Sequence, residues 1–145
     1  MKRLLVTLFA ALFSMGAQAL GRVVSYEELP FSTVTKAITC GDWRRSDESG
    51  MFRVLLAYHS GQSMLFIDMV KPSADQTLLV VDRGFTIDEF DNDHADYDIS
   101  ALRCQSTGDG KIRITGRTEN AGGEKGRFRL DFDGYTGKHS LTWPK

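Results

Sequence analysis

The clearest hydrophobic pattern lies in the C-terminal third of the chain, where apolar and charged residues alternate. Residues 111–118 carry Ile112 and Ile114 on the same parity as Gly116 and Thr118. Residues 126–133 repeat the alternation, with Phe128, Leu130 and Phe132 on one parity. A period of two is typical of a strand with one buried and one exposed face. We therefore predict two such strands, joined by a turn at 120–124.

A third strand is predicted before this pair. Residues 97–106 end at Thr107-Gly108-Asp109-Gly110, which is turn chemistry, so the three runs should form an antiparallel meander. Residues 135–143 are expected to add a last short strand.

The first half of the chain predicts a hairpin. Phe52–Tyr58 and Met64–Val70 flank a five-residue segment with a Ser-Gly pair. Both parities of the second run are apolar, so we expect this strand to be covered on both faces. Asp68 interrupts it and needs a cationic or hydroxyl partner. A further strand is predicted from Thr77 to Asp82, with Gly84 ending or bulging it.

These short strands and tight turns define the expected fold class. It is all-β and mainly antiparallel: a small meander-type sandwich or partly closed barrel with at most one or two short helical turns. One such turn is expected at Ser25–Glu28, which has capping-box spacing, before Leu29-Pro30 stops it.

The N-terminal segment predicts export. Lys2 and Arg3 precede the apolar run Leu4–Phe13 and the small-residue motif Ala17-Gln18-Ala19. A run of about ten residues spans roughly 15 Å as a helix, too short for a hydrocarbon core of about 30 Å. We expect residues 1–19 to be a cleaved signal peptide and residues 20–145 to be one exported domain, periplasmic or secreted, without a lipid-anchor cysteine at the cleavage site.

Export makes the two cysteines, Cys40 and Cys104, the expected partners of a disulfide. Closing a loop of about 65 residues contributes roughly 4 kcal/mol in the chain-entropy model. The alternative, a redox dithiol, lacks the usual C-x-x-C spacing.

The charge composition argues against nucleic-acid binding. The chain has 145 residues, 18 Lys and Arg against 19 Asp and Glu, and a formal net charge of −1. It therefore lacks the excess of positive charge that nucleic-acid binding relies on.

Residues 82–98 form an acidic segment in which Arg83 is the one Lys or Arg. A solvated loop, a partner contact through Asp88, Asp91 and Asp93, and a calcium site are the alternatives. The calcium candidates are Asp91, Asp93 and Asp96, but Ala95 stands at the fifth position of an EF-hand pattern and Asp96 where Gly is needed.

A cationic patch is predicted on the exposed face of the last two long strands. Its members share the outward parity of the alternating runs: Arg113, Arg117, Arg127 and Arg129. It is expected either to solubilise this face, balanced by Asp131 and Asp133, or to dock an acidic partner, because arginine is favoured at interface anchors.

No spacing in the chain predicts a catalytic site or a cofactor. His59, His94 and His139 form no metal-binding pair, and Ser60 and Ser63 lie in no G-x-S-x-G motif.

The expected export, size and single disulfide are similar to those of periplasmic lysozyme inhibitors and of immunity proteins. The S-G-x-x-Y signature of one such inhibitor family is incomplete here, because Ser49-Gly50 and Ser60-Gly61 are followed by Arg53 and Met64 in place of tyrosine. We therefore assign the chain to no family.

The sequence favours a non-enzymatic exported protein that docks on another exported protein, as an inhibitor or immunity-type partner. The alternative is a barrel that binds a small ligand in an apolar pocket lined by Phe52, Tyr58, Phe66 and Phe85.

Overall fold

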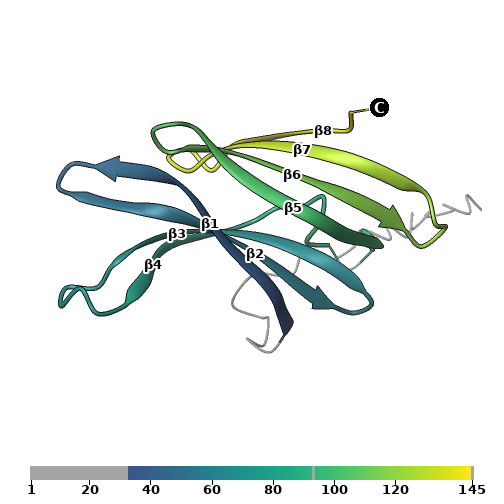
Figure 1. Cartoon of the computed structure of the whole chain (residues 1–145), viewed down its shortest axis with the longest axis horizontal. Helices are drawn as coiled ribbons and strands as arrows, with labels where there is room; N and C mark the ends of the chain where they lie inside the picture. The colour runs from purple at the N-terminus through teal and green to yellow at the C-terminus, as the bar shows by residue number, and fades with distance from the viewer. Residues whose placement is uncertain (1–32, 93, 145) are drawn as a thin grey trace, which may run out of the picture.

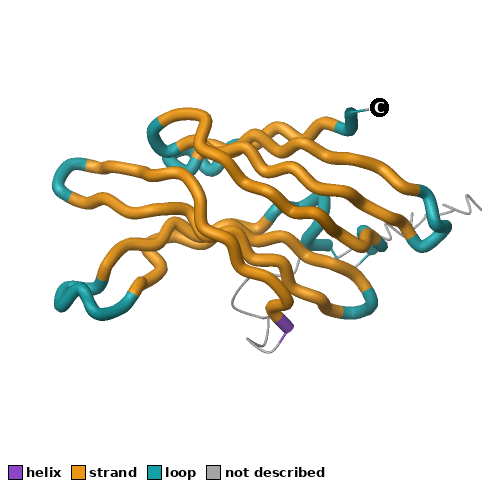
Figure 2. Tube along the Cα trace, viewed as in Figure 1, coloured by secondary structure: helices purple, strands orange, loops and turns teal. Residues whose placement is uncertain are grey.

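Two antiparallel sheets make up the computed structural model, which describes residues 33–92 and 94–144 (Figures 1 and 2). The first sheet has the order β1-β2-β3-β4 and the second β5-β6-β7-β8. The strands are β1 Val34–Arg45, β2 Glu48–His59, β3 Gln62–Pro72, β4 Leu79–Thr86, β5 Tyr97–Gly108, β6 Lys111–Asn120, β7 Lys125–Asp133 and β8 His139–Thr142.

The all-β class is confirmed, and the sandwich is the architecture formed. Each sheet is a meander, and the segment 87–96 carries the chain from one to the other (Figure 1). The two sheets are not closed into a barrel within the described residues. In that part of the chain no helix has the length and apolar character needed to cross a membrane. The predicted signal peptide and the turn at Ser25–Glu28 lie outside the described residues.

The core lies between the inner faces of the sheets. The predicted inward residues of β6 and β7 are all buried there: Ile112, Ile114, Phe128, Leu130 and Phe132. They pack with buried residues of the first sheet, including Trp43, Phe52, Val54, Leu65, Ile67 and Met69. The alternation read from the C-terminal third therefore gives the correct face for each of these side chains.

β3 is covered on both faces, as predicted. Leu65 and Ile67 belong to the main core, whereas Met64 and Phe66 join a second cluster with Leu55 and Ala57. On this second face the fully buried Asp68 carboxylate accepts hydrogen bonds from the Arg53 guanidinium at 2.6 and 3.0 Å. The ion pair expected for Asp68 is thus present, and removing Arg53 would leave a buried charge at a cost of several kcal/mol.

β4 differs from its predicted course. The strand runs from Leu79 to Thr86, so Gly84 neither ends it nor forms its irregularity. The register shifts between Met69 and Val70 of β3, which leaves Asp82 as the extra residue of β4. A bulge needs one additional residue in one strand, and a polar side chain at the surface is tolerated there as well as glycine.

The predicted disulfide joins the two sheets. Cys40 of β1 is bonded to Cys104 of β5, with their Cα atoms 5.8 Å apart. A second connection joins β1 to the turn between β7 and β8: the Tyr135 hydroxyl accepts a hydrogen bond from the Arg44 N–H at 2.9 Å and donates one to the Arg44 carbonyl at 2.6 Å. The Tyr135 ring fits because Gly110, at φ +65°, has no Cβ, which would lie 2.3 Å from the ring.

Replacing Tyr135 with phenylalanine should lower the free energy of unfolding by about 1 kcal/mol, because two hydrogen bonds to the Arg44 backbone are lost. Urea denaturation measures the change. Tyr58→Phe is the matched control. Tyr58 is 50% exposed, so loss of its hydroxyl should change the free energy of unfolding by less than about 0.5 kcal/mol. Equal effects of the two substitutions would contradict this role of Tyr135.

Candidate functional site

The acidic segment does not form one surface. Asp91 is fully buried; its carboxylate accepts hydrogen bonds from the Leu65 N–H at 2.6 Å and the Ile87 N–H at 2.5 Å. Burial raises the pKa of the Asp91 carboxyl well above its usual value. Asp91 therefore joins the segment 87–91 to β3 and is neither an accessible partner contact nor an open cation ligand, which corrects both predictions for this residue.

The other acidic residues of the segment have separate surroundings. Asp88 and Asp96 are exposed, and Asp93 lies outside the described residues. Glu89 pairs with His139 at 2.9 Å. No group of three His, Cys, Asp or Glu residues that could hold a metal ion occurs within 33–92 and 94–144.

The four aromatic residues proposed for an apolar pocket do not line a common cavity. Phe52 and Phe85 pack in the core against Phe132, whereas Phe66 lies in the cluster on the opposite face of the first sheet. Tyr58 is half exposed at the end of β2. The sandwich core is filled at this place, so the predicted lining of a ligand-binding barrel is wrong.

The predicted arginine patch divides into a paired and an unpaired half. Across β6 and β7, Arg113 lies opposite Asp131, and their side chains form an ion pair at 2.6 Å. Arg129 also contacts Asp131, at 3.3 Å. Arg117 lies directly opposite Arg127, and neither forms an ion pair with a described carboxylate.

A fifth arginine joins the unpaired half. Arg103 lies opposite Thr115 on the same outer face, because β5 contains one extra residue between the pairs Ser100–Arg117 and Arg103–Thr115. This bulge is formed around Ala101, which has φ +51°. Strict alternation from the buried Ile99 would instead turn Arg103 into the core, so the bulge places this guanidinium outside.

Four of the arginines surround a depression of about 420 Å³ on the outer face of the second sheet: Arg103, Arg117, Arg127 and Arg129. Its lining is Ala101, Arg103, Thr115, Gly116, Arg117, Arg127, Phe128, Arg129 and Pro144. A Cβ at Gly116 would lie 2.5 Å from the buried Phe128 ring and 3.2 Å from the Ser100 carbonyl, so the close packing of β6 at this point favours glycine.

The depression has the chemistry of an anion-binding site. Like charges directly opposite each other on a sheet are unfavourable, and a bound anion between Arg117 and Arg127 relieves that repulsion. Guanidinium groups bind carboxylate or phosphate through two parallel hydrogen bonds. We call Arg103, Arg117 and Arg127, with the depression between them, the arginine site.

Comparison with protein-family models, curated proteins and solved structures finds no match for this chain.

The repulsion between Arg117 and Arg127 should lower the free energy of unfolding of the protein. Arg127→Thr should raise the free energy of unfolding by about 0.2–1 kcal/mol at low ionic strength, because it removes the repulsion with Arg117. The gain should shrink as salt screens the two charges. Arg113→Thr is the control and should be destabilising, because it removes the pair with Asp131. Chemical denaturation at two salt concentrations measures both changes, and a destabilising Arg127→Thr would contradict the assignment.

Proposed function

We propose that this protein is a non-enzymatic binding protein of an oxidising, extracytoplasmic compartment, which docks on an acidic surface of another exported protein through the arginine site. By docking in this way the protein would act as an inhibitor or as an immunity-type partner.

The observation that carries this proposal is the presence of three arginines around one depression without an ion pair to a described carboxylate. The same face also carries neutralised cations, since Asp131 pairs with Arg113 and Arg129, whereas the three unpaired arginines gather around one depression. Arginines left unneutralised on a rigid sheet are preorganised for a partner's carboxylates, which limits the entropy lost on binding.

Two further features support the proposal, the first concerning docking and the second the compartment. The residues that line the depression include no His, Cys, Asp or Glu, the usual acids, bases and nucleophiles of enzymes. The disulfide between the sheets is compatible with an oxidising compartment outside the cytoplasm.

Charge reversal of the site tests the proposal. The partner is first captured from native extract on the immobilised protein, identified by mass spectrometry and remade in pure form. Arg117→Glu with Arg127→Glu should then weaken its affinity by about 100-fold or more, since each variant carboxylate repels the acidic surface. The affinity of the unmodified protein should fall as salt is raised.

Arg44→Glu with Lys138→Glu is the matched control, because it changes the net charge equally at two exposed residues outside the depression. The control should bind like the unmodified protein, and both variants should keep its melting temperature within a few degrees. Full affinity in the Arg117 and Arg127 variant, or equal losses in both variants, would refute docking at the arginine site.

A further inference from the structure

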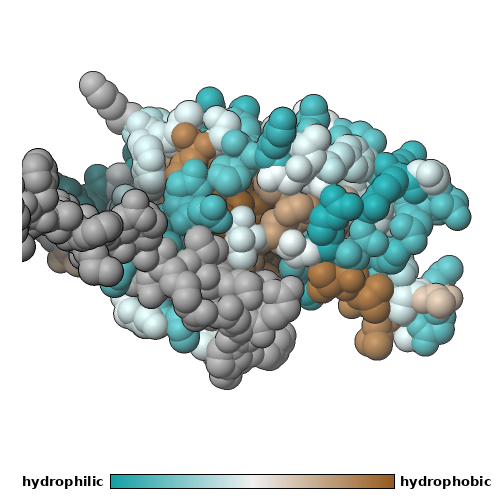
Figure 3. Space-filling model, turned by 180° about the vertical axis from the view of Figure 1, so that it is seen from behind, coloured by the Kyte–Doolittle hydropathy of each residue, from teal (hydrophilic) through white to brown (hydrophobic). Residues whose placement is uncertain are grey.

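An exposed apolar segment lies at the start of β4, on the sheet that does not carry the arginine site. Leu78, Leu79, Val80 and Val81 are 69%, 49%, 39% and 43% exposed. These four consecutive residues include most of the large apolar side chains exposed in the described part of the chain, the others being Tyr58 and Trp143. Figure 3 shows the hydrophobic residues gathered where the β3–β4 hairpin projects beyond the second sheet in Figure 1.

The segment belongs to a sheet edge. β4 pairs with β3 on one side, and no described strand pairs with its other side. Edge strands of natural proteins are usually protected by charged residues, proline, a β-bulge or a short length, and in β4 the bulge and the charges begin only at Asp82. Residues 78–81 carry no charge and no proline. The other edge of the first sheet, β1, is held against β5 by the disulfide.

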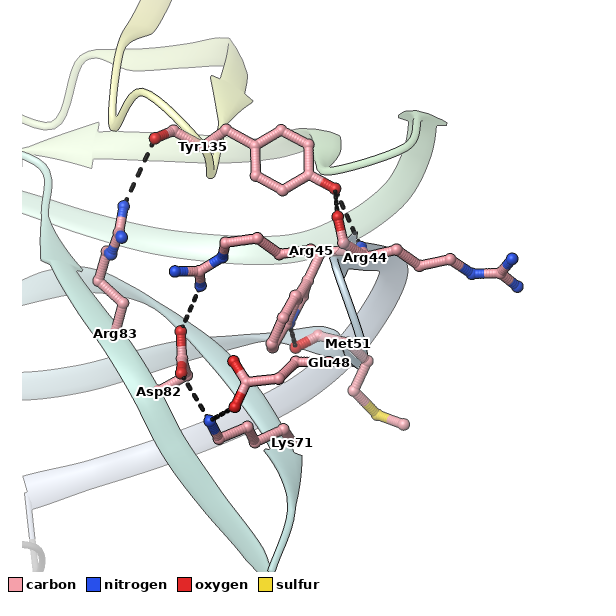
Figure 4. Close-up of polar contacts among 9 residues, drawn as sticks. Arg44, Arg45, Glu48, Met51, Lys71, Asp82, Arg83 and Tyr135 are labelled. Carbon is pink, nitrogen blue, oxygen red and sulfur yellow. Dashed lines mark hydrogen bonds and ion pairs between the residues drawn. The ribbon is translucent and has the colours of Figure 1, made fainter.

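Four charged side chains beside this segment form ion pairs with one another (Figure 4). Asp82 contacts Arg45 at 2.6 Å and Lys71 at 3.0 Å, and Lys71 also contacts Glu48 at 2.6 Å. These contacts lower the pKa of Asp82 and raise the pKa of Lys71. Residues 78–81 themselves carry no charge, and Arg83, two positions beyond them, forms no ion pair with a described carboxylate and donates to the Tyr135 carbonyl at 3.4 Å.

The turn before β4 is also ordered. The Ser73 N–H donates to the Leu78 carbonyl at 2.8 Å, and the Ser73 hydroxyl accepts from the Leu78 N–H at 3.1 Å. Asp75 accepts hydrogen bonds from Ser73 and Thr77, which lower its pKa to about 2. Leu78 is thus presented by a hydrogen-bonded turn, and pairing at this edge has little backbone entropy to lose.

From this geometry we propose that the β4 edge binds a second copy of the same chain, with the two β4 strands antiparallel about a two-fold axis at Val80. The result is one continuous eight-stranded sheet. The interaction is independent of the arginine site.

A second copy is the occupant because the segment is complementary to itself. In this register Val80 lies opposite Val80 and Leu79 opposite Val81, so each apolar side chain meets an apolar one. Beyond this core, Leu78 precedes the strand and approaches Asp82 at the bulge, and Thr77 approaches Arg83, so no like charges face each other. The formal net charge is small, −1 for the whole chain and −3 once Lys2 and Arg3 are removed with the expected signal peptide, so it adds little repulsion between two copies. An interface of this length predicts a weak dimer that forms with rising concentration.

Sedimentation equilibrium across micromolar to millimolar protein tests the association. The unmodified protein should shift from monomer to dimer, and Val81→Lys should weaken dimerisation at least tenfold, because it places a charge at the apolar edge. Tyr58→Lys is the matched control, since it converts another half-exposed apolar side chain to lysine away from β4. A monomer at every concentration, or equal dimerisation by Val81→Lys and the unmodified protein, would overturn the proposal.

Cross-linking tests the register and does not depend on how well Val81→Lys folds. The two natural cysteines are bonded to each other, so Val80→Cys introduces the one free thiol among the described residues. Opposite residues of an antiparallel pair are close enough for a disulfide, and mild oxidation should give a covalent dimer. Thr77→Cys should not, because the register separates the two Thr77 residues by six positions along the strands, roughly 20 Å. Equal cross-linking of both variants, or none of Val80→Cys, would refute pairing about Val80.

Discussion

One extra residue in β5 determines on which side of the second sheet the following side chains lie. Ile99 and Thr118 face the core, and strict alternation from Ile99 would place Arg103 inside and Cys104 outside. The bulge around Ala101 reverses this: Leu102 is buried, Arg103 is exposed and Cys104 reaches Cys40 on the other sheet. The left-handed backbone of Ala101 costs roughly 1–2 kcal/mol, which the buried Leu102 and the disulfide offset.

The same bulge connects the fold with the candidate site. It places Arg103 next to two arginines that the regular alternation of β6 and β7 already turns outward. These arginines lie on the outer face of the sheet, so packing of the core does not restrict which charged residues stand there. Asp131 neutralises Arg113 and Arg129 but leaves Arg117 and Arg127 opposed, and the proposed docking rests on this difference.

Sequence patterns predicted the regular parts of this structure and missed the irregular ones. Alternation gave the faces of β6 and β7, and with them Arg113, Arg117, Arg127 and Arg129, because one side of these strands is buried. No glycine or proline marks the bulge in β5, so Arg103 could not be placed. The burial of Asp91 had a signal that was not used: Ile87, Phe90 and Asp91 have the spacing of one helical turn, and Phe90 and Asp91 both donate to the Ile87 carbonyl. The sequence predicts the apolar run Leu78–Val81 as part of a strand but not its exposure, because exposure of an edge depends on sheet order, which local patterns do not contain.

The most direct test of this account is the cross-strand pattern of nuclear Overhauser effects between β5 and β6 in the oxidised protein. The bulge predicts contacts that pair Ser100 with Arg117 and Arg103 with Thr115, with both Ala101 and Leu102 between these two pairs. Contacts that pair Leu102 with Thr115 would show an uninterrupted strand. Arg103 would then point toward the core, and the arginine site would not exist in the form described.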